Sequence, residues 1–186
     1  DSKFSISEAI STLDAAGLNT PTNIDERGTK RVLSAWAKAA KGQRKNFVMM
    51  SSIGVQRRGQ MPFPILNACG VLDAKASAEE ALKADAAAAG YSYTVVRPGQ
   101  LFGGPYDNNY YLGTLFQLDK DADTQDVQVA PGDTLVGDTL RSTLAEVIAQ
   151  LLECGSAQNC DFSVVNVAGA SPAVDQLQQR LSSLSA

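Results

Sequence analysis

The chain has 186 residues, of which 44% are hydrophobic and 19% charged, the balance of a globular domain with a sizeable core. Its net charge of −4 and the lack of a basic block argue against a nucleic-acid or anionic-membrane surface, and no apolar run approaches the ~20 residues of a membrane span. The sequence contains no histidine, which excludes Ser-His-Asp and Cys-His catalysis and histidine-ligated metals, so no metal site is expected.

The first residues, 1–22, are expected to be a weakly structured lead-in, in which 5–15 has the spacing of a short helix. An amphipathic pattern then predicts a helix over 25–41, with Asn23 or Asp25 as its N-cap.

Two short apolar runs, 47–51 and 93–96, flank a long alanine-rich helix predicted over 67–89. The first run ends at two serines and the second at an Arg-Pro-Gly turn. Apolar runs that alternate with helices indicate β-α-β units of a parallel sheet, and ligands of such sheets bind at the carboxyl ends of the strands. In the loop after the first run, Arg57 and Arg58 either meet a phosphate or an acidic partner, or are solvated, which is the commoner case.

The rest of the chain continues the alternation of strands and helices. Its predicted elements are an aromatic, amide-rich loop at 106–111, a short helix at 112–118, an edge-like strand at 126–130, a turn with an N-cap in the GDTL tandem at 132–140, a helix at 139–153, a strand at 162–167 and a final helix at 172–184. The first two apolar runs and the strand at 162–167 are expected in one parallel sheet. No linker divides the chain, so residues 1–186 are predicted to form a single domain.

The three cysteines, Cys69, Cys154 and Cys160, form no CxxC pair, and an odd number is a poor disulfide framework. We expect small hydrophobic side chains in a reducing compartment. A local bridge between Cys154 and Cys160 stays open as the alternative.

Four stretches occur in a fixed order: FVMMSSIGV, GVLDAKASAEEAL, YTVVRPGQL followed by GGPY, and GDTLVGDTLRSTLAEVIAQLL. In this order and spacing they resemble the atypical short-chain dehydrogenase/reductases of the NmrA-like NAD(P)-binding group, most closely plastid members from plants and algae. The stretch NTPTNIDERGTKRVL is similar to the helix that precedes the first of them, so the resemblance spans about residues 19–167. It implies an α/β fold with a Rossmann-like parallel sheet, flanked by helices, that holds a dinucleotide.

The resemblance also implies roles for individual residues. By position, the two serines face the nicotinamide, the lysine of GVLDAK holds its ribose, and the backbone of the Arg-Pro-Gly turn meets its carboxamide. In the family this lysine also lowers the pKa of a catalytic tyrosine, because an ammonium beside a phenol favours the phenolate. Lys75 and Ser52 are therefore candidate catalytic residues, in a vestigial or weak form. The candidate cofactor-binding residues are Ser51, Ser52, Lys75, Arg97, Pro98 and Gly99.

Two departures from the family pattern change these expectations. The tyrosine should lie four residues before the lysine, where this chain has Val71, and plastid relatives often lack it too. A GxxGxxG fingerprint should lie upstream of the strand at 47–51, and nothing in residues 1–23 resembles it. The fold is thus expected to lack its N-terminal Gly-rich half, either because this chain, which starts at Asp1, is a piece of a longer protein or because that half has been lost. NADP or NAD is expected only if the upstream half exists.

Two functions stay open. The first is a non-catalytic NAD(P)-binding-type protein that serves as an accessory or assembly subunit of a plastid complex, for example a photosynthetic one. It would have protein partners, bind no nucleic acid, and reach a membrane only through a partner. Its exposed sheet edge near 47–50 and its helix at 25–41 would be the contacts. The second is an NADPH-dependent oxidoreductase or isomerase with an unusual proton donor, such as Tyr106 or Tyr110.

Overall fold

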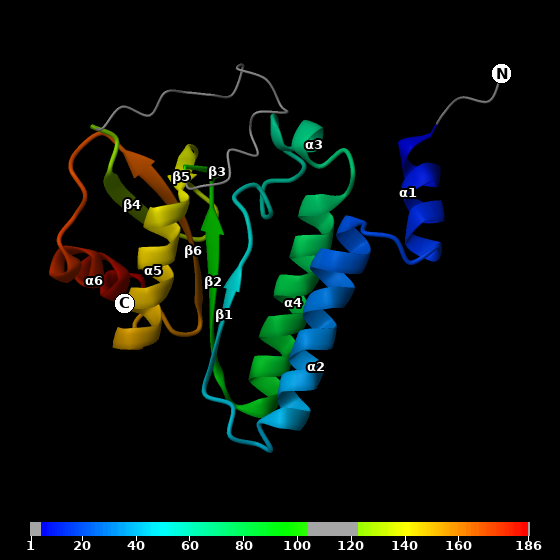
Figure 1. The fold of residues 1–186 in the computed structure, drawn as a ribbon, viewed down its shortest axis with the longest axis horizontal. Helices are drawn as coiled ribbons and strands as arrows, with labels where there is room; N and C mark the ends of the chain where they lie inside the picture. Colours follow the sequence, from blue (N-terminus) through cyan, green and yellow to red (C-terminus); the bar gives the residue numbers. More distant parts are fainter. Residues whose placement is uncertain (1–4, 104–122, 186) are drawn as a thin grey trace. The chain divides into compact units, whose positions relative to one another are not determined.

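A computed structural model describes residues 5–103 and 123–185 of the chain (Figure 1). The fold is α/β, with helices flanking a mixed, mainly parallel set of strands, which confirms the expected fold class. The chain divides into two compact units, Asp1–Tyr93 and Thr94–Ala186. The single domain over 1–186 stays a prediction. The predicted loop at 106–111, with Tyr106 and Tyr110, and the predicted helix at 112–118 lie outside the described residues.

The first unit is built from helices and one complete strand. Its elements are α1 (Ile6–Ala15), the π-helix η1 (Thr22–Gly28), α2 (Thr29–Ala39), β1 (Asn46–Met50), α3 (Phe63–Leu66) and α4 (Val71–Ala89). The two long helices, α2 and α4, run side by side (Figure 1). The short helix predicted over 5–15 is confirmed, with the Ser5 hydroxyl accepting the N–H of Glu8 at its start.

The helix predicted over 25–41 is two elements that follow each other directly. It starts earlier, at Thr22, as the π-helical η1, and it ends at Ala39. The predicted α-helix is therefore wrong in its first turns, which have i→i+5 geometry; such π-helical stretches are frequently found at functional sites.

The helix predicted over 67–89 begins four residues late, at Val71. The side-chain oxygen of Asn67 accepts the N–H groups of Leu72 and Asp73 at 2.8 and 3.3 Å, so it caps α4 from outside the helix. Gly70 turns the chain between them with a φ of +74°, which residues with a side chain rarely adopt. A separate turn therefore replaces the expected first turn of the helix.

An aromatic cluster holds the start of β1 against α2 and the end of α4. The ring of Trp36 lies 5.5 Å from that of Phe47 and 4.9 Å from that of Tyr91, centroid to centroid. The Arg44 guanidinium stacks 4.7 Å above the Tyr91 ring and pairs with the Asp85 carboxylate at 2.5 Å. Burial, together with the hydrogen bond that the Tyr91 hydroxyl donates to Asp85, raises the pKa of Tyr91 well above its usual range.

The second unit has β6 at the centre of its sheet. Its elements are β2 (Ser92–Pro98), which starts at the boundary of the units, β3 (Gln100–Phe102), β4 (Asp126–Pro131), β5 (Asp138–Leu140), α5 (Arg141–Cys154), β6 (Cys160–Val167), α6 (Val174–Ser182) and a 3-10 turn (Ser183–Ser185). β6 pairs in parallel with β2 and antiparallel with β4. The parallel pairing of the strands near 93–96 and 162–167 is confirmed, as is the strand at 126–130.

The GDTL tandem does not form the predicted turn and N-cap at its second copy. Residues Asp138–Leu140 are instead β5, which pairs in parallel with β3. Thr139 is fully buried; its hydroxyl accepts the N–H of Gly99 at 2.9 Å and donates to the carbonyl of Val164 at 2.7 Å. This strand depends on contacts distant in sequence, which local residue preferences do not contain.

The cysteines are all free thiols in the structure. Cys160 donates to the carbonyl of Ala157 at 3.0 Å, and burial raises the pKa of its thiol. The alternative of a bridge between Cys154 and Cys160 is therefore not realised.

Candidate functional site

The two serines at the end of β1 point their hydroxyls to different partners. Ser51 is 4% exposed, and its hydroxyl donates to Glu79 at 2.6 Å. Glu79 is equally buried and lies on α4, one turn after Lys75. Ser52 is half-buried and donates to the carbonyl of Ile53 at 3.0 Å. Ser51 thus fastens the strand end to α4, and Glu79 is a site residue that sequence reasoning missed.

Lys75 contacts a carboxylate, where the family pattern places a phenol. Its ammonium donates to the Asp25 carboxylate at 2.7 Å, and the two side chains are 19% and 25% exposed. Asp25 belongs to η1 and was expected only as a helix cap. The two residues are 50 positions apart, so no local pattern connects them.

The position of the family's tyrosine is part of an apolar cluster. Val71 and Ile53 pack against a buried group formed by Val55, Phe63, Leu72 and Ala76. No hydroxyl, amine or carboxyl belongs to this group, so the position one helical turn before Lys75 supplies no proton.

A groove of about 480 Å³ runs beside β1 and contains the ion pair of Lys75 and Asp25. Its walls come from η1, the start of α2 and four consecutive residues of β1, Phe47–Met50. Successive side chains of a strand point to opposite faces, so four consecutive lining residues mean that the groove follows the strand's edge. Three large apolar side chains of this groove are at least half exposed: Ile24, Val32 and Met50.

The Arg-Pro-Gly stretch in the second unit is engaged in its own fold. Arg97 is fully buried and pairs with Asp161 of β6. Pro98 is buried at the end of β2, and the Gly99 N–H donates to Thr139 of β5. The Arg97 side chain therefore stabilises the sheet. The expected contact between the backbone of the Arg-Pro-Gly turn and the carboxamide of a nicotinamide stays a prediction.

The interpretation of the loop arginines as solvated side chains is wrong for Arg57, which is packed, while the side chain of Arg58 is 41% exposed in an ion pair at the surface. The Arg57 guanidinium lies 4.7 Å above the Phe63 ring. Arg58 donates to the Val55 carbonyl at 2.7 Å and pairs with Asp73 at 2.9 Å. The Phe63 ring comes from α3 and the Asp73 carboxylate from α4, which the loop sequence alone does not reveal.

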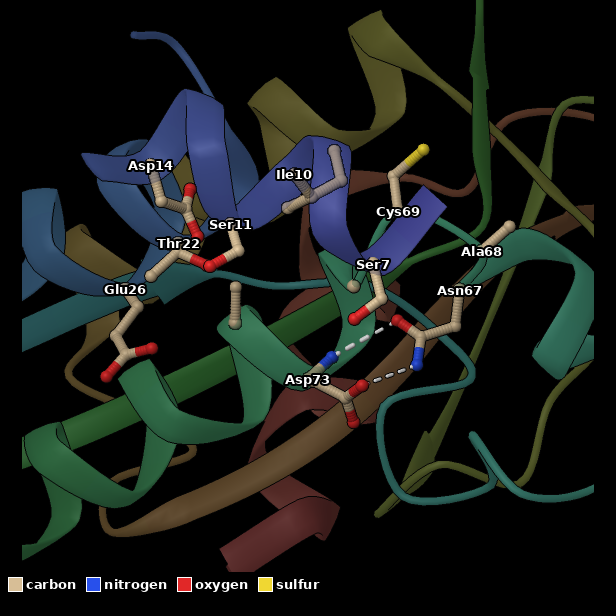
Figure 2. A pocket seen from close by; sticks show the side chains of 12 residues that line it. Ser7, Ile10, Ser11, Asp14, Thr22, Glu26, Asn67, Ala68, Cys69 and Asp73 are labelled. Atoms are coloured by element: carbon tan, nitrogen blue, oxygen red, sulfur yellow. Dashed lines mark hydrogen bonds between the residues drawn. The ribbon is translucent and has the colours of Figure 1, made fainter. Parts of the chain in front are cut away.

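Figure 2 shows a second pocket, of about 450 Å³, between α1, η1 and the start of α4. Its carboxylates each have a partner: Asp14 with Thr20, Glu26 with Lys30, and Asp73 with Asn67. The hydrogen bond from Lys30 lowers the pKa of Glu26. Within residues 5–103 and 123–185, no group of three or more acidic or cysteine side chains is arranged to hold a metal ion. The pocket therefore suggests structural contacts between helices rather than a cation site.

None of the helices in the described part of the chain is long and apolar enough to cross a membrane.

Comparisons with known proteins identify the family. A family profile described as NAD(P)H-binding matches residues 5–154, most of the chain. Protein TIC 62, chloroplastic, of Pisum sativum is 32% identical over 149 residues, which is 79% of this chain and 23% of the pea protein. The chain thus spans about a quarter of the length of this curated relative.

Two solved structures are similar to the chain. A protein of Bacillus halodurans, assigned as an NAD-dependent epimerase/dehydratase, is 25% identical with a TM-score of 0.60, covering 86% of this chain and 61% of that one. The oxidoreductase ylbE of Lactococcus lactis is 17% identical with a TM-score of 0.60, covering 99% and 74%, and shows the fold alone.

The donor set in the groove fits one part of a dinucleotide. An ammonium and a carboxylate side by side supply the donors and acceptors that the hydroxyls of a ribose need, and apolar walls lie next to them. With its sequence matched over residues 5–154 and its Rossmann-like neighbours in structure, the chain belongs to the NAD(P)H-binding family.

Proposed function

We propose that the protein is a catalytically silent, atypical short-chain dehydrogenase/reductase of the NmrA-like type that works as an accessory or assembly subunit of a plastid complex. The observation that carries the silent role is Val71, packed in an apolar cluster where the family has its tyrosine. Reduction of a carbonyl needs a proton donor beside the lysine. Here the lysine is bound to the Asp25 carboxylate.

The proposed ligand is NADP or NAD, and the bound nucleotide would supply a hydride if chemistry occurred. Lys75 would hold the nicotinamide ribose and Ser52 would face the nicotinamide, while Ser51 fixes the strand end through Glu79. The sequence has no GxxGxxG ahead of β1, so the pyrophosphate needs donors from an upstream Gly-rich half.

Titration of the full-length protein with NADPH and NADH tests this binding. We expect Lys75→Ala to weaken it about tenfold, since hydrogen bonds from charged groups contribute on the order of 1.5–3 kcal/mol. Lys38→Ala is the matched control, because this exposed lysine of α2 lies outside the groove. No binding of either nucleotide, or equal affinity of the Lys75 variant and the wild type, would contradict the proposal.

The proposed subunit role rests on the exposed apolar side chains of the groove along β1, and leaves the ion pair of Lys75 and Asp25 to the nucleotide. Ile24, Val32 and Met50 leave apolar surface in water beside a strand edge, which proteins normally cover. The 32% identity to a chloroplastic protein supports a plastid location, and we propose a photosynthetic complex as an example of the host. Residues 1–186 expressed alone should therefore fail to give a stable monomer. A monodisperse monomer with a cooperative thermal transition would show that no partner is required.

A second candidate is an NADPH-dependent oxidoreductase or isomerase with Tyr106 or Tyr110 as its proton donor. The similarity to the assigned epimerase/dehydratase of Bacillus halodurans favours it. NADPH consumption by the full-length protein with a panel of carbonyl substrates, lost in Tyr106→Phe or Tyr110→Phe, would establish this function over the silent one.

A further inference from the structure

We infer that Asp25 is the acceptor half of a site for the vicinal diol of a ribose, with Lys75 as its donor half. This inference rests on the proposed nucleotide binding and adds a residue that the family resemblance did not supply.

The contact between the two side chains leaves hydrogen-bonding capacity on both. The ammonium of Lys75 has three N–H donors and gives one to Asp25 Oδ1 at 2.7 Å. A carboxylate has about four acceptor positions, so most of those of Asp25 stay available for other donors. A vicinal diol presents two O–H donors and two acceptor oxygens, which is the complement of this pair.

The location of the pair supports a ligand role. Both side chains line the groove beside β1, and they are 19% and 25% exposed. The same ion pair joins η1 to α4, so its opening to the groove is what makes its remaining donors and acceptors accessible to a ligand. Partial burial strengthens charge-assisted hydrogen bonds, and the opposite charges cancel, so the pair suits an uncharged sugar better than a phosphate.

The backbone around Asp25 is held in place before any ligand arrives. Its carbonyl accepts the hydroxyl of Thr29 at 2.7 Å. The side chain of Asn23 donates to the carbonyls of Leu18 and Asp14 at 2.9 and 3.1 Å, which anchors the start of η1. The acceptor is thus preorganised, so that little ordering cost remains for binding.

A double-mutant cycle between protein and ligand tests the contact. The full-length wild type and Asp25→Ala are titrated with NADH and with a deoxy analogue whose nicotinamide ribose lacks both the 2′- and the 3′-hydroxyl. We expect Asp25→Ala to weaken NADH binding at least about tenfold, the size of one charge-assisted hydrogen bond, and to change binding of the deoxy analogue little. Equal loss for both ligands would show that Asp25 acts only through the fold, and would overturn the inference.

Two further variants keep the test decisive. If Asp25→Ala fails to fold, Asp25→Asn, which keeps the shape and one acceptor oxygen, should still lose several-fold of the preference for NADH over the deoxy analogue. Glu26→Ala removes the neighbouring ion pair with Lys30, outside the groove, and should leave the preference unchanged. If the wild type binds neither ligand, the proposed nucleotide binding fails and the inference with it; if it binds both equally, only the inference fails.

Discussion

Replacement of Gly99 by alanine tests the close approach of two backbones in the second unit. A Cβ at this position would overlap the carbonyl oxygen of Gly137 and lie 2.8 Å from its carbon and 3.1 Å from the Cα of Asp138. These are backbone atoms next to β5, which cannot rotate away as a side chain does. Relief requires β3 and β5 to separate, which also strains the hydrogen bond between Gly99 and Thr139.

The expected cost of Gly99→Ala is about 3 kcal/mol, the upper part of the usual range for overpacking in a core. For a chain of this size, such a loss lowers the melting temperature by roughly 6–12 °C. Thermal and urea unfolding followed by circular dichroism measure it. Gly59→Ala is the matched control, because a Cβ there meets nothing within 4 Å. A Gly99→Ala protein within about 0.5 kcal/mol of the wild type would refute the packing described for β3 and β5.

Two further perturbations probe single contacts. Ser51→Ala removes the hydroxyl that donates to the buried Glu79, so the urea midpoint should fall by an amount equivalent to about 2 kcal/mol; an unchanged midpoint would mean that the bond contributes nothing. The hydrogen bond from Arg180 lowers the pKa of Asp126 below its ordinary value of 3.8. As the pH falls, the Asp126 carboxylate therefore takes up a proton in the unfolded state before it does so in the folded state. The stability that the pair contributes is complete above about pH 4, and it is lost as the pH falls through the folded pKa. Asp126→Asn should flatten the acid side of the stability profile, and equal slopes in both proteins would count against the pairing.

The spacing of apolar residues in the sequence predicted most elements of the fold, because apolar residues recur at the positions that a helix or strand buries. The strands near 93–96 and 162–167 and the helix at 139–153 were predictable, since each is a run of apolar residues with one clear spacing. β5 was not, because three residues gain their strand geometry from pairing with β3. The start of α4 was also misplaced, since the capping oxygen of Asn67 lies outside the helix that it caps.

The candidate site was predictable only where its residues belong to a local motif. The serines, Lys75 and the absence of the tyrosine at Val71 follow from order and spacing in the chain. Asp25 and Glu79 reach the site from distant positions, and their partners are visible only after folding. Acidic residues on a helix are usually solvated, so nothing in their sequence context marked these two as residues of the site.

The packing of Trp36 has a consequence for spectroscopy. It is the single tryptophan of the chain, and it lies entirely within the first unit, against Phe47, Tyr91 and Arg44. Tryptophan fluorescence therefore reports on the unfolding of the first unit and does not detect unfolding of the second unit. Circular dichroism senses helices in both. Denaturation curves from the two signals will coincide only if the units unfold together, so one fluorimeter trace beside one dichroism trace reveals whether the halves of this chain are thermodynamically independent.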